Sequence, residues 1–265
     1  MKNILFLDLD ATLWLNEQIP LSASSAIFQA KHNGHKIFVN TGRTKGEGIV
    51  PLLPLKLDGY CFSAGSEIYI GDQTLIFDPL KPEDAKSMTQ FMLDHKIGVS
   101  LEGSDKTYLD AINKAEFLQR IQVNPQAQAI QRFLAMPNIH QVKEEDYSQF
   151  TKLYLCNPNA VDPAIIQQAV TSDCELTMFG MDTGEITNIH HNKGTAIQDV
   201  KNYYGNEYRT IAFGDSENDL SMFEAADIAV AMGNAKPEIQ KKADYVTKDI
   251  RKHGLYHAFK YFDLI

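Results

Sequence analysis

The sequence contains few cysteines and no long apolar run. Its three cysteines, Cys61, Cys156 and Cys174, are scattered and form no CxxC pair. This pattern argues against a disulfide framework and favours reduced thiols in the cytoplasm. No apolar stretch approaches the ~20 residues of a membrane-spanning helix, and an apolar strand begins at Ile4, which leaves no room for a signal peptide. We therefore expect a cytoplasmic protein that does not associate with membranes.

The sequence also lacks an excess of basic residues. It has 25 Lys and Arg against 34 Asp and Glu, which gives a formal net charge of −9. This balance argues against nucleic acids or anionic membranes as partners. It does not argue against a small phosphorylated ligand, because a metal ion and a few cations reverse the field inside one cleft. With 44% hydrophobic residues in a chain of 265, the core can be that of one large domain or two ordinary ones.

Two carboxylates directly follow the first apolar segment. Ile4–Leu7 has no polar alternation, which is typical of a strand buried on both faces of a parallel sheet. Asp8 and Asp10, separated by Leu9, lie two residues apart at the end of this strand and are expected to point the same way. Like charges this close need a cation between them or a proton on one of them, and an oxygen-rich site favours Mg²⁺. Taken alone, these residues also fit an acidic loop after a core strand.

The first eighty residues alternate between strands and a helix. Pro20–Gly34 predicts a helix, with Ser22 as a candidate N-cap. The helix lies between Ile4–Leu7 and a second strand at Lys36–Asn40, so the three form a βαβ unit with a right-handed crossover. A third strand and a hairpin complete this half of the chain: Leu57–Ser63, then Glu67–Ile70 paired with Thr74–Phe77.

The pattern changes at Asp78–Pro82, and the alternation returns at Asn192. Short strands and helices in irregular order between these points predict an α+β insert. After Asn192 a helix runs to Tyr204, and further strands and helices follow at Arg209–Phe213, Ser216–Ala226, Ile228–Ala231, Tyr245–Val246 and His253–Phe262. We therefore predict the α/β class: a Rossmann-like parallel-sheet core made of residues 1–80 and 190–265, and an inserted α+β domain of residues 81–189.

Polar residues follow the ends of several strands of the predicted core. Thr41 follows the second strand, and Asp215 follows the strand at Arg209–Phe213. Ligands bind outside the carboxyl ends of parallel strands, so these two residues are expected to meet Asp8 and Asp10. Asp8, Asp10 and Asp215 would supply oxygen ligands for one Mg²⁺. The structural alternatives are a loop acid for Asp215 and a turn-capping hydroxyl for Thr41.

Neighbouring polar groups predict an anion site beside this metal site. Lys193 starts a helix, and a helix N-terminus favours an anion. Thr41 offers a hydroxyl, Gly42 has no Cβ and lets a ligand approach the backbone, and Asn218 adds an amide. An anion site next to a metal site implies a phosphate ester. On its own, Lys193 would more simply be a solvated lysine.

Four segments of the sequence resemble motifs of the haloacid dehalogenase superfamily of phosphatases, and within it the Cof-type branch. They are DLDATL at residues 8–13, NTGR at 40–43, NKGTA at 192–196 and GDSENDLSMF at 214–223. The resemblance covers both halves of the predicted core, and it implies that the insert is a cap domain. One departure is Ala11, where glycine is common in the family.

The resemblance also implies a role for each matching residue. Asp8 would be the nucleophile that forms an aspartyl-phosphate, and Asp10 the general acid and base. The metal ligands would be Asp8, the backbone carbonyl of Asp10 and Asp215, with Asp219 in the outer shell. Backbone donors of Leu9, together with Thr41, Gly42, Lys193 and Asn218, would hold the phosphate. The implied activity is Mg²⁺-dependent hydrolysis of small phosphorylated metabolites, with sugar phosphates as the leading class.

Two other functions remain open from the sequence, a hexose-phosphate phosphomutase and a non-catalytic sensor of phosphorylated ligands. A mutase usually carries a compact basic cluster in its cap, which the insert lacks. A sensor has no need of Asp10. Several residues are also left open: Ser216 and Asp219 fit a helix capping box, Arg43 has no assigned role beyond a possible acid partner, and Trp14 is expected to pack beside the first motif. Oligomeric state is not indicated.

Overall fold

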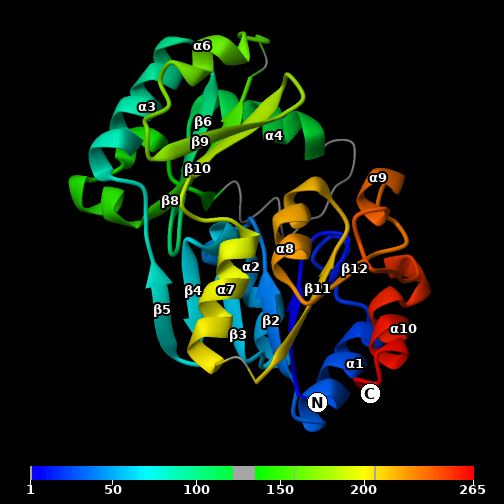
Figure 1. Cartoon of the computed structure of the whole chain (residues 1–265). Coiled ribbons are helices and arrows are strands. Elements are labelled where there is room, and N and C mark those ends of the chain that lie inside the picture. The colour runs from blue at the N-terminus through cyan, green and yellow to red at the C-terminus, as the bar shows by residue number, and fades with distance from the viewer. Residues whose placement is uncertain (1, 122–134, 158, 206) are drawn as a thin grey trace. The chain divides into compact units, whose positions relative to one another are not determined.

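The computed structural model describes residues 2–121, 135–157, 159–205 and 207–265. Contacts divide the chain into two compact units. One, called the core unit here, comprises Met1–Arg43, Glu47–Phe77 and His191–Ile265. The other, called the cap unit, comprises Thr44–Gly46 and Asp78–His190. Each unit has its own sheet (Figure 1). Each also has its own apolar core.

The core unit is built on an eight-stranded mixed sheet with the order β13-β12-β11-β1-β2-β3-β4-β5. Neighbours from β13 to β3 pair in parallel, whereas β3, β4 and β5 pair antiparallel. The predicted strands and hairpin of the core are confirmed, with small shifts at their ends. The strands are β1 Asn3–Leu7, β2 Lys36–Asn40, β3 Gly59–Phe62, β4 Glu67–Ile70, β5 Gln73–Phe77, β11 Arg209–Gly214, β12 Ile228–Ala231 and β13 Tyr245–Val246.

Strand β1 is buried on both faces because its side chains alternate between two apolar clusters. Leu5 and Leu7 pack on one face with α1 (Leu21–His32) and α10 (Gly254–Tyr261). Ile4 and Phe6 pack on the other face with α7 (Lys193–Tyr204) and α8 (Leu220–Ala225). All four of these side chains are fully buried. The helices of this part of the chain are α1 Leu21–His32, α2 Lys45–Leu52, α7 Lys193–Tyr204, α8 Leu220–Ala225, α9 Pro237–Gln240 and α10 Gly254–Tyr261 (Figure 1).

The sheet changes direction of growth at β1. From β1 the chain adds β2 and β3 on one side, and after the cap unit it adds β11, β12 and β13 on the other. This is the topological switch point at which open α/β sheets bind ligands, outside the carboxyl ends of the strands. Asp8 follows β1 and Asp215 follows β11, so both acids lie at that point.

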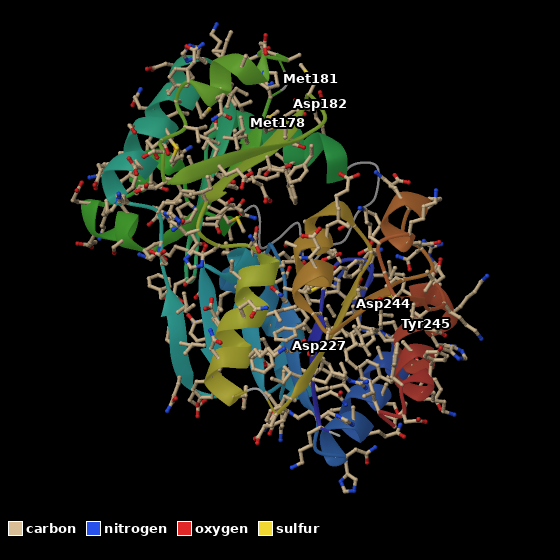
Figure 2. All side chains as sticks on the ribbon, in the orientation of Figure 1. Met178, Met181, Asp182, Asp227, Asp244 and Tyr245 are labelled. Carbon is tan, nitrogen blue, oxygen red and sulfur yellow. The ribbon has the colours of Figure 1, made fainter. Side chains whose placement is uncertain are left out.

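Acids at the opposite end of the same sheet serve the backbone. Asp227 accepts from the Thr210 backbone N–H at 2.7 Å, and Asp244 accepts from the Ala229 N–H at 2.8 Å (Figure 2). These contacts satisfy donors at the amino ends of β11 and β12. Carboxylates therefore occur at both ends of the sheet. Asp227 and Asp244 bind backbone N–H groups at the amino ends of the strands, whereas Asp8 and Asp215 lie together at the carboxyl ends.

The cap unit contains a five-stranded antiparallel sheet with the order β7-β6-β8-β10-β9. One face packs Leu101, Leu153 and Ile186 against Met88 and Met92 of α3 in an apolar core. The elements are α3 Pro82–Asp94, β6 Gly98–Gly103, β7 Thr107–Leu109, α4 Ala111–Ile121, β8 Phe150–Cys156, α6 Pro163–Gln167, β9 Cys174–Phe179 and β10 Thr183–Asn188. The α+β character predicted for the insert is confirmed.

The structure corrects two local predictions and contains one helix that was not predicted. Ser22 is not the N-cap of α1: Pro20 holds that position, and the Ser22 hydroxyl lies 2.9 Å from His253 Nδ1. The helix expected at residues 216–226 is a short 3-10 turn, Glu217–Asp219, followed by α8. Helix α2 was not predicted, because its eight residues include two glycines and a proline, which are poor helix formers. Among the described residues, no helix is long and apolar enough to cross a membrane.

Candidate active site

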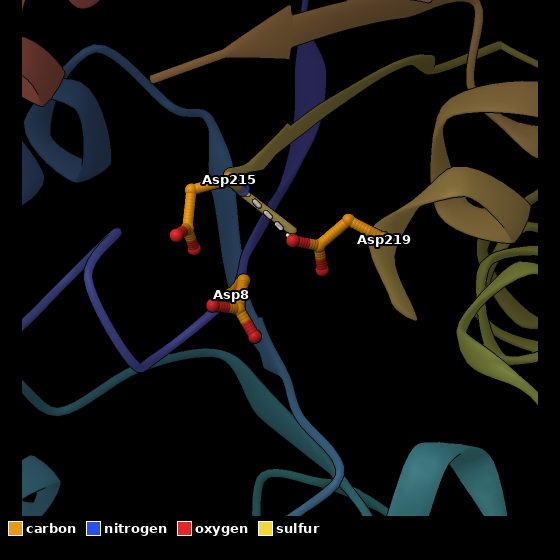
Figure 3. A group of neighbouring side chains, drawn as sticks. All are labelled: Asp8, Asp215 and Asp219. Carbon is orange, nitrogen blue, oxygen red and sulfur yellow. Dashed lines mark hydrogen bonds between the residues drawn. The ribbon is translucent and has the colours of Figure 1, made fainter. Parts of the chain in front are cut away.

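Three carboxylates meet at the switch point. Asp8, Asp215 and Asp219 each place an oxygen atom within 4.8 Å of the others (Figure 3). Asp8 is 5% exposed and Asp219 is fully buried, whereas Asp215 is half-buried. Residues more than 200 positions apart in sequence are brought together because β1 and β11 are parallel neighbours, with Leu7 opposite Phe213.

Lys193 joins this cluster from the first residue of α7. Its ammonium nitrogen lies 2.6 Å from Asp8 Oδ1 and 2.5 Å from Asp219 Oδ1, and the side chain is 1% exposed. The backbone around it is fixed from two sides. Asn192 caps the helix by accepting from two backbone N–H groups, and Asn40 Nδ2 donates to the Lys193 carbonyl at 2.8 Å. Lys193 is thus a buried partner of the acids, and the solvated-lysine alternative is wrong.

The cluster carries more negative than positive charge. Three carboxylates against one ammonium leave an excess of two negative charges. Burial and the nearby Asp219 raise the pKa of Asp8 well above its usual range, and the same two causes raise the pKa of Asp215 to about 6. Burial alone would lower the pKa of Lys193, but Asp219 and Asp8 raise it overall. The arrangement therefore favours an added cation, which would let all three acids ionise.

Asp219 is held more tightly by the protein than the other two acids. Its Oδ2 accepts from the backbone N–H of Asp215 at 2.8 Å (Figure 3). The same oxygen accepts from the Ser216 N–H at 3.0 Å, while Oδ1 faces Lys193. The capping role expected of Asp219 is present in these contacts. The close approach needs Gly214, where a Cβ would lie 2.5 Å from the Asp219 carboxylate. Both oxygens of Asp219 already have protein donors, which fits an indirect contribution to a metal site.

The expectation that the Asp8 and Asp10 carboxylates share one small volume is wrong: Asp10 lies outside this cluster and faces a different cation, Arg43. Arg43 donates to it twice, from Nε to Oδ2 at 2.7 Å and from a terminal nitrogen to Oδ1 at 2.9 Å. Trp14 Nε1 adds a third hydrogen bond to Oδ1 at 3.0 Å. Burial would raise the pKa of Asp10, but the hydrogen bonds and charge of Arg43, with Trp14, lower it overall. Arg43 thus has the acid partner that the sequence left open.

The other predicted anion-binding residues lie around the same strand ends. Thr41 follows β2 and is buried, and its hydroxyl accepts from the Arg43 backbone N–H at 3.1 Å, so the turn-capping alternative is also present. A Cβ at Gly42 would meet no atom within 4 Å, so there is space beside its Cα. The Asn218 amide oxygen lies 3.3 Å from Lys193 Nζ. Leu9 is fully buried.

Several residues that shape the site were not identified from the sequence. Thr12 donates from its hydroxyl to Asp215 Oδ1 at 3.2 Å. Asn234 donates to the carbonyl of Ala11 at 3.0 Å, and Ala11 has a left-handed φ of 60°. That backbone conformation explains why glycine would suit position 11. Asn40 lay within a quoted motif, but only the packed structure shows that its amide supports Lys193.

The core unit combines an α/β fold with a buried acid–lysine cluster at the switch point of its sheet. The family model described as haloacid dehalogenase-like hydrolase matches residues 5–259. The chain therefore belongs to this family, as the sequence motifs predicted, and it is a hydrolase of the phosphatase type.

Similarity to individual proteins extends over almost the whole chain. The chain is 27% identical to the mannosyl-3-phosphoglycerate phosphatase of Pyrococcus furiosus, over 95% of its own length and 99% of that protein. A solved structure reported for a trigonal-bipyramidal intermediate in a phosphoryl-transfer superfamily is 26% identical, with a TM-score of 0.79 and complete coverage of both chains. The structure of BT4131, described as a sugar phosphatase of HAD subclass IIB, has 24% identity and a TM-score of 0.76 over 99% of this chain and 100% of that one. The last likeness supports the fold.

The donor set of this chain fits a divalent metal ion. Hard cations prefer carboxylate oxygens, and Asp8, Asp215 and Asp219 provide three in a small volume. The excess of two negative charges matches a divalent ion. The cluster can therefore hold such an ion.

Proposed function

We propose that the protein is a Mg²⁺-dependent phosphomonoesterase that acts through an aspartyl-phosphate on Asp8. The observation that carries this proposal is the cluster of Asp8, Lys193, Asp215 and Asp219 at the switch point of the core sheet. Asp8, the backbone carbonyl of Asp10 and Asp215 would hold the ion, with Asp219 in the outer shell. When bound, Mg²⁺ would neutralise negative charge on the transferring phosphoryl group.

In this mechanism Asp8 attacks phosphorus, and the bond from phosphorus to the substrate oxygen breaks. Asp10 gives a proton to the departing oxygen, and in the second half it takes a proton from the water that hydrolyses the aspartyl-phosphate. The ionised Asp10 that Arg43 holds suits this second role. Inorganic phosphate then leaves, and the Asp8 carboxylate is regenerated.

The phosphate would be held by residues whose positions the fold fixes. Lys193 supplies charge, while Thr41, the Gly42 backbone and backbone donors of Leu9 supply hydrogen bonds. The Asn218 amide oxygen already faces Lys193, so its NH₂ group is the one that would donate. Positioning and charge stabilisation of this kind are the main catalytic contributions in phosphoryl transfer.

The substrate class that we propose is small phosphorylated metabolites, with sugar phosphates first. The names of the relatives, a mannosyl-3-phosphoglycerate phosphatase and a sugar phosphatase, point the same way. We propose the cytoplasm as the location.

The test is phosphate release from p-nitrophenyl phosphate and from a panel of sugar phosphates, with Mg²⁺ and with a chelator. We expect release that requires the ion and is abolished in Asp8→Asn. A matched control is Asp227→Asn, which changes an acid at the other end of the sheet and should keep activity. Transfer of phosphate to a second hydroxyl of a hexose 1-phosphate, without release, would favour a mutase instead. Ligand binding without turnover would favour a sensor.

A further inference from the structure

We propose that the turn Ser63–Gly65, called the brace here, positions two backbone segments that we assign to phosphate binding. One segment is Thr41–Arg43, which follows β2, and the other is the first turn of α7, which carries Lys193. The brace directly follows β3 and belongs to the same compact unit as both segments. This inference rests on the proposed function, because it concerns groups that are assigned there to the phosphate.

The brace has a backbone conformation that side chains disfavour. Ser63, Ala64 and Gly65 have φ values of 48°, 54° and 103°. A positive φ is uncommon for any residue that carries a Cβ, and here two such residues adopt it in succession. Backbone strain of this kind persists only where the surrounding structure holds it, and it is concentrated at functional sites.

The turn brings two N–H groups of the brace to the segment after β2. The Ser63 N–H donates to the Arg43 carbonyl at 2.8 Å, and the Ala64 N–H donates to the Thr41 carbonyl at 2.8 Å. These two carbonyls lie on either side of Gly42. A trans peptide is planar, so its C=O and N–H groups point in opposite directions. The bond to the Thr41 carbonyl therefore also sets the direction of the Gly42 N–H, which belongs to the proposed phosphate site.

The brace also packs closely against the start of α7. A Cβ at Gly65 would lie 3.0 Å from the Ala196 Cβ and 3.1 Å from the Asn192 carbonyl oxygen. Both distances are shorter than ordinary van der Waals contact, so a side chain at position 65 would press on the first turn of the helix. Asn192 caps α7 immediately before Lys193. The brace thus determines where the segment with Lys193 lies relative to the segment with Thr41.

A turn that only ended β3 would contribute to folding and not to ligand affinity. The two roles differ in the inhibition constant of inorganic phosphate, because this constant does not depend on the fraction of the protein that is folded. A positioning role predicts that the folded variants bind phosphate more weakly than the wild type. A structural role predicts a lower stability with the same inhibition constant.

The first experiment removes one N–H group of the brace. L-lactate in place of Ala64 changes the amide after Ser63 into an ester, which removes the donor to the Thr41 carbonyl and keeps the methyl group. The readout is competitive inhibition by phosphate of p-nitrophenyl phosphate hydrolysis by the full chain with Mg²⁺. We expect the inhibition constant to rise by about 3- to 10-fold, as for the loss of one hydrogen bond. The control is L-lactate in place of Ala229, whose N–H donates to Asp244 at the amino end of the sheet, and it should keep the wild-type constant.

The second experiment adds one methyl group to the brace. Gly65→Ala should raise the inhibition constant about 10-fold, because a small displacement of a binding group has a large effect. Gly71→Ala is the matched control: Gly71 also has a left-handed φ, of 57°, but a Cβ there would meet no atom within 4 Å. It should keep the wild-type constant. Adding Ala196→Gly to Gly65→Ala removes the nearest opposing atom and should restore part of the phosphate affinity.

The outcomes separate this inference from the function on which it rests. If the wild type is active and phosphate inhibits it, a wild-type inhibition constant in either folded variant overturns the brace, and the phosphatase stands. Equal rises in the variants and their controls overturn the brace as well. If Gly65→Ala does not fold, the lactate variant decides, because it loses a single hydrogen bond. If the wild type hydrolyses neither p-nitrophenyl phosphate nor sugar phosphates, the proposed function fails, and the brace fails with it.

Discussion

Lys193 provides the sharpest test of the electrostatics of the site. Replacing it by Met shortens the side chain by one atom and keeps an unbranched apolar stem. It removes the ammonium from between Asp8 and Asp219, at 2.6 and 2.5 Å. Asp8, Asp215 and Asp219 would then remain close together without a cation. The Lys193 side chain is only 1% exposed, so solvent would not take its place. Removing one partner of a buried ion pair costs about 3–5 kcal/mol. We expect this loss in the free energy of unfolding at pH 8 without metal.

The matched control lies on the same helix. Lys201 pairs with Asp227 at 3.3 Å and is partly exposed, so Lys201→Met should cost at most about 1 kcal/mol. Urea denaturation in chelator measures both variants. Mg²⁺ should recover part of the Lys193→Met loss, because the ion replaces some of the missing positive charge. Equal losses for the two variants would refute the assignment of Lys193 as the buried counter-ion of the cluster.

Further predictions concern the metal, the pH and the turn at Ala11. Mg²⁺ at 100 times its dissociation constant should stabilise the wild type by about 2.7 kcal/mol. Calorimetric titration should show that Asp215→Asn binds Mg²⁺ more weakly than the wild type. Equal affinity of the two proteins would contradict the assignment of Asp215 as a metal ligand. The pKa of Asp215 is raised to about 6 from a usual 3.8, so the folded state binds more protons between pH 4 and 6, and its stability falls as pH rises through that window. In chelator, Asp215→Asn should therefore gain stability relative to wild type from pH 4 to 7, and a constant difference in urea denaturation would count against this. Asn234→Ala removes two hydrogen bonds, one donated to the Ala11 carbonyl at 3.0 Å and one accepted from the Ile250 N–H at 2.9 Å. We expect the free energy of unfolding, measured by thermal unfolding, to fall by about 1–3 kcal/mol. No loss would mean that solvent replaces both contacts.

The apolar segments and the strand-end acids were predictable because they depend on local pattern. Ile4–Leu7 has the uninterrupted apolar character of a strand covered on both faces, and the structure buries it between two clusters. Strand order at a switch point then brings Asp8 and Asp215 together whatever their distance in sequence. The place of Lys193 in the site was predictable, because it starts a helix. Its nearly complete burial was not predictable.

The contacts that orient the acids were not predictable, because each joins side chains from loops whose paths the sequence pattern leaves open. Arg43 and Asp10 are 33 residues apart, and Thr12 and Asp215 are 203 apart. Ser22 shows the same limit at a helix end. A serine near a helix start favours capping. In α1, however, Pro20 is at the N-cap position, and the Ser22 hydroxyl lies within hydrogen-bond distance of His253.

The most direct test of the central claim is a search for phosphate covalently bound to Asp8. The enzyme is mixed with Mg²⁺ and a radiolabelled sugar phosphate, quenched in acid within milliseconds, and digested for peptide mapping. The account predicts a hydroxylamine-labile label on the peptide that contains Asp8, and none in Asp8→Asn. Mg²⁺-dependent hydrolysis that persists in Asp8→Asn, or a label on a different residue, would contradict it.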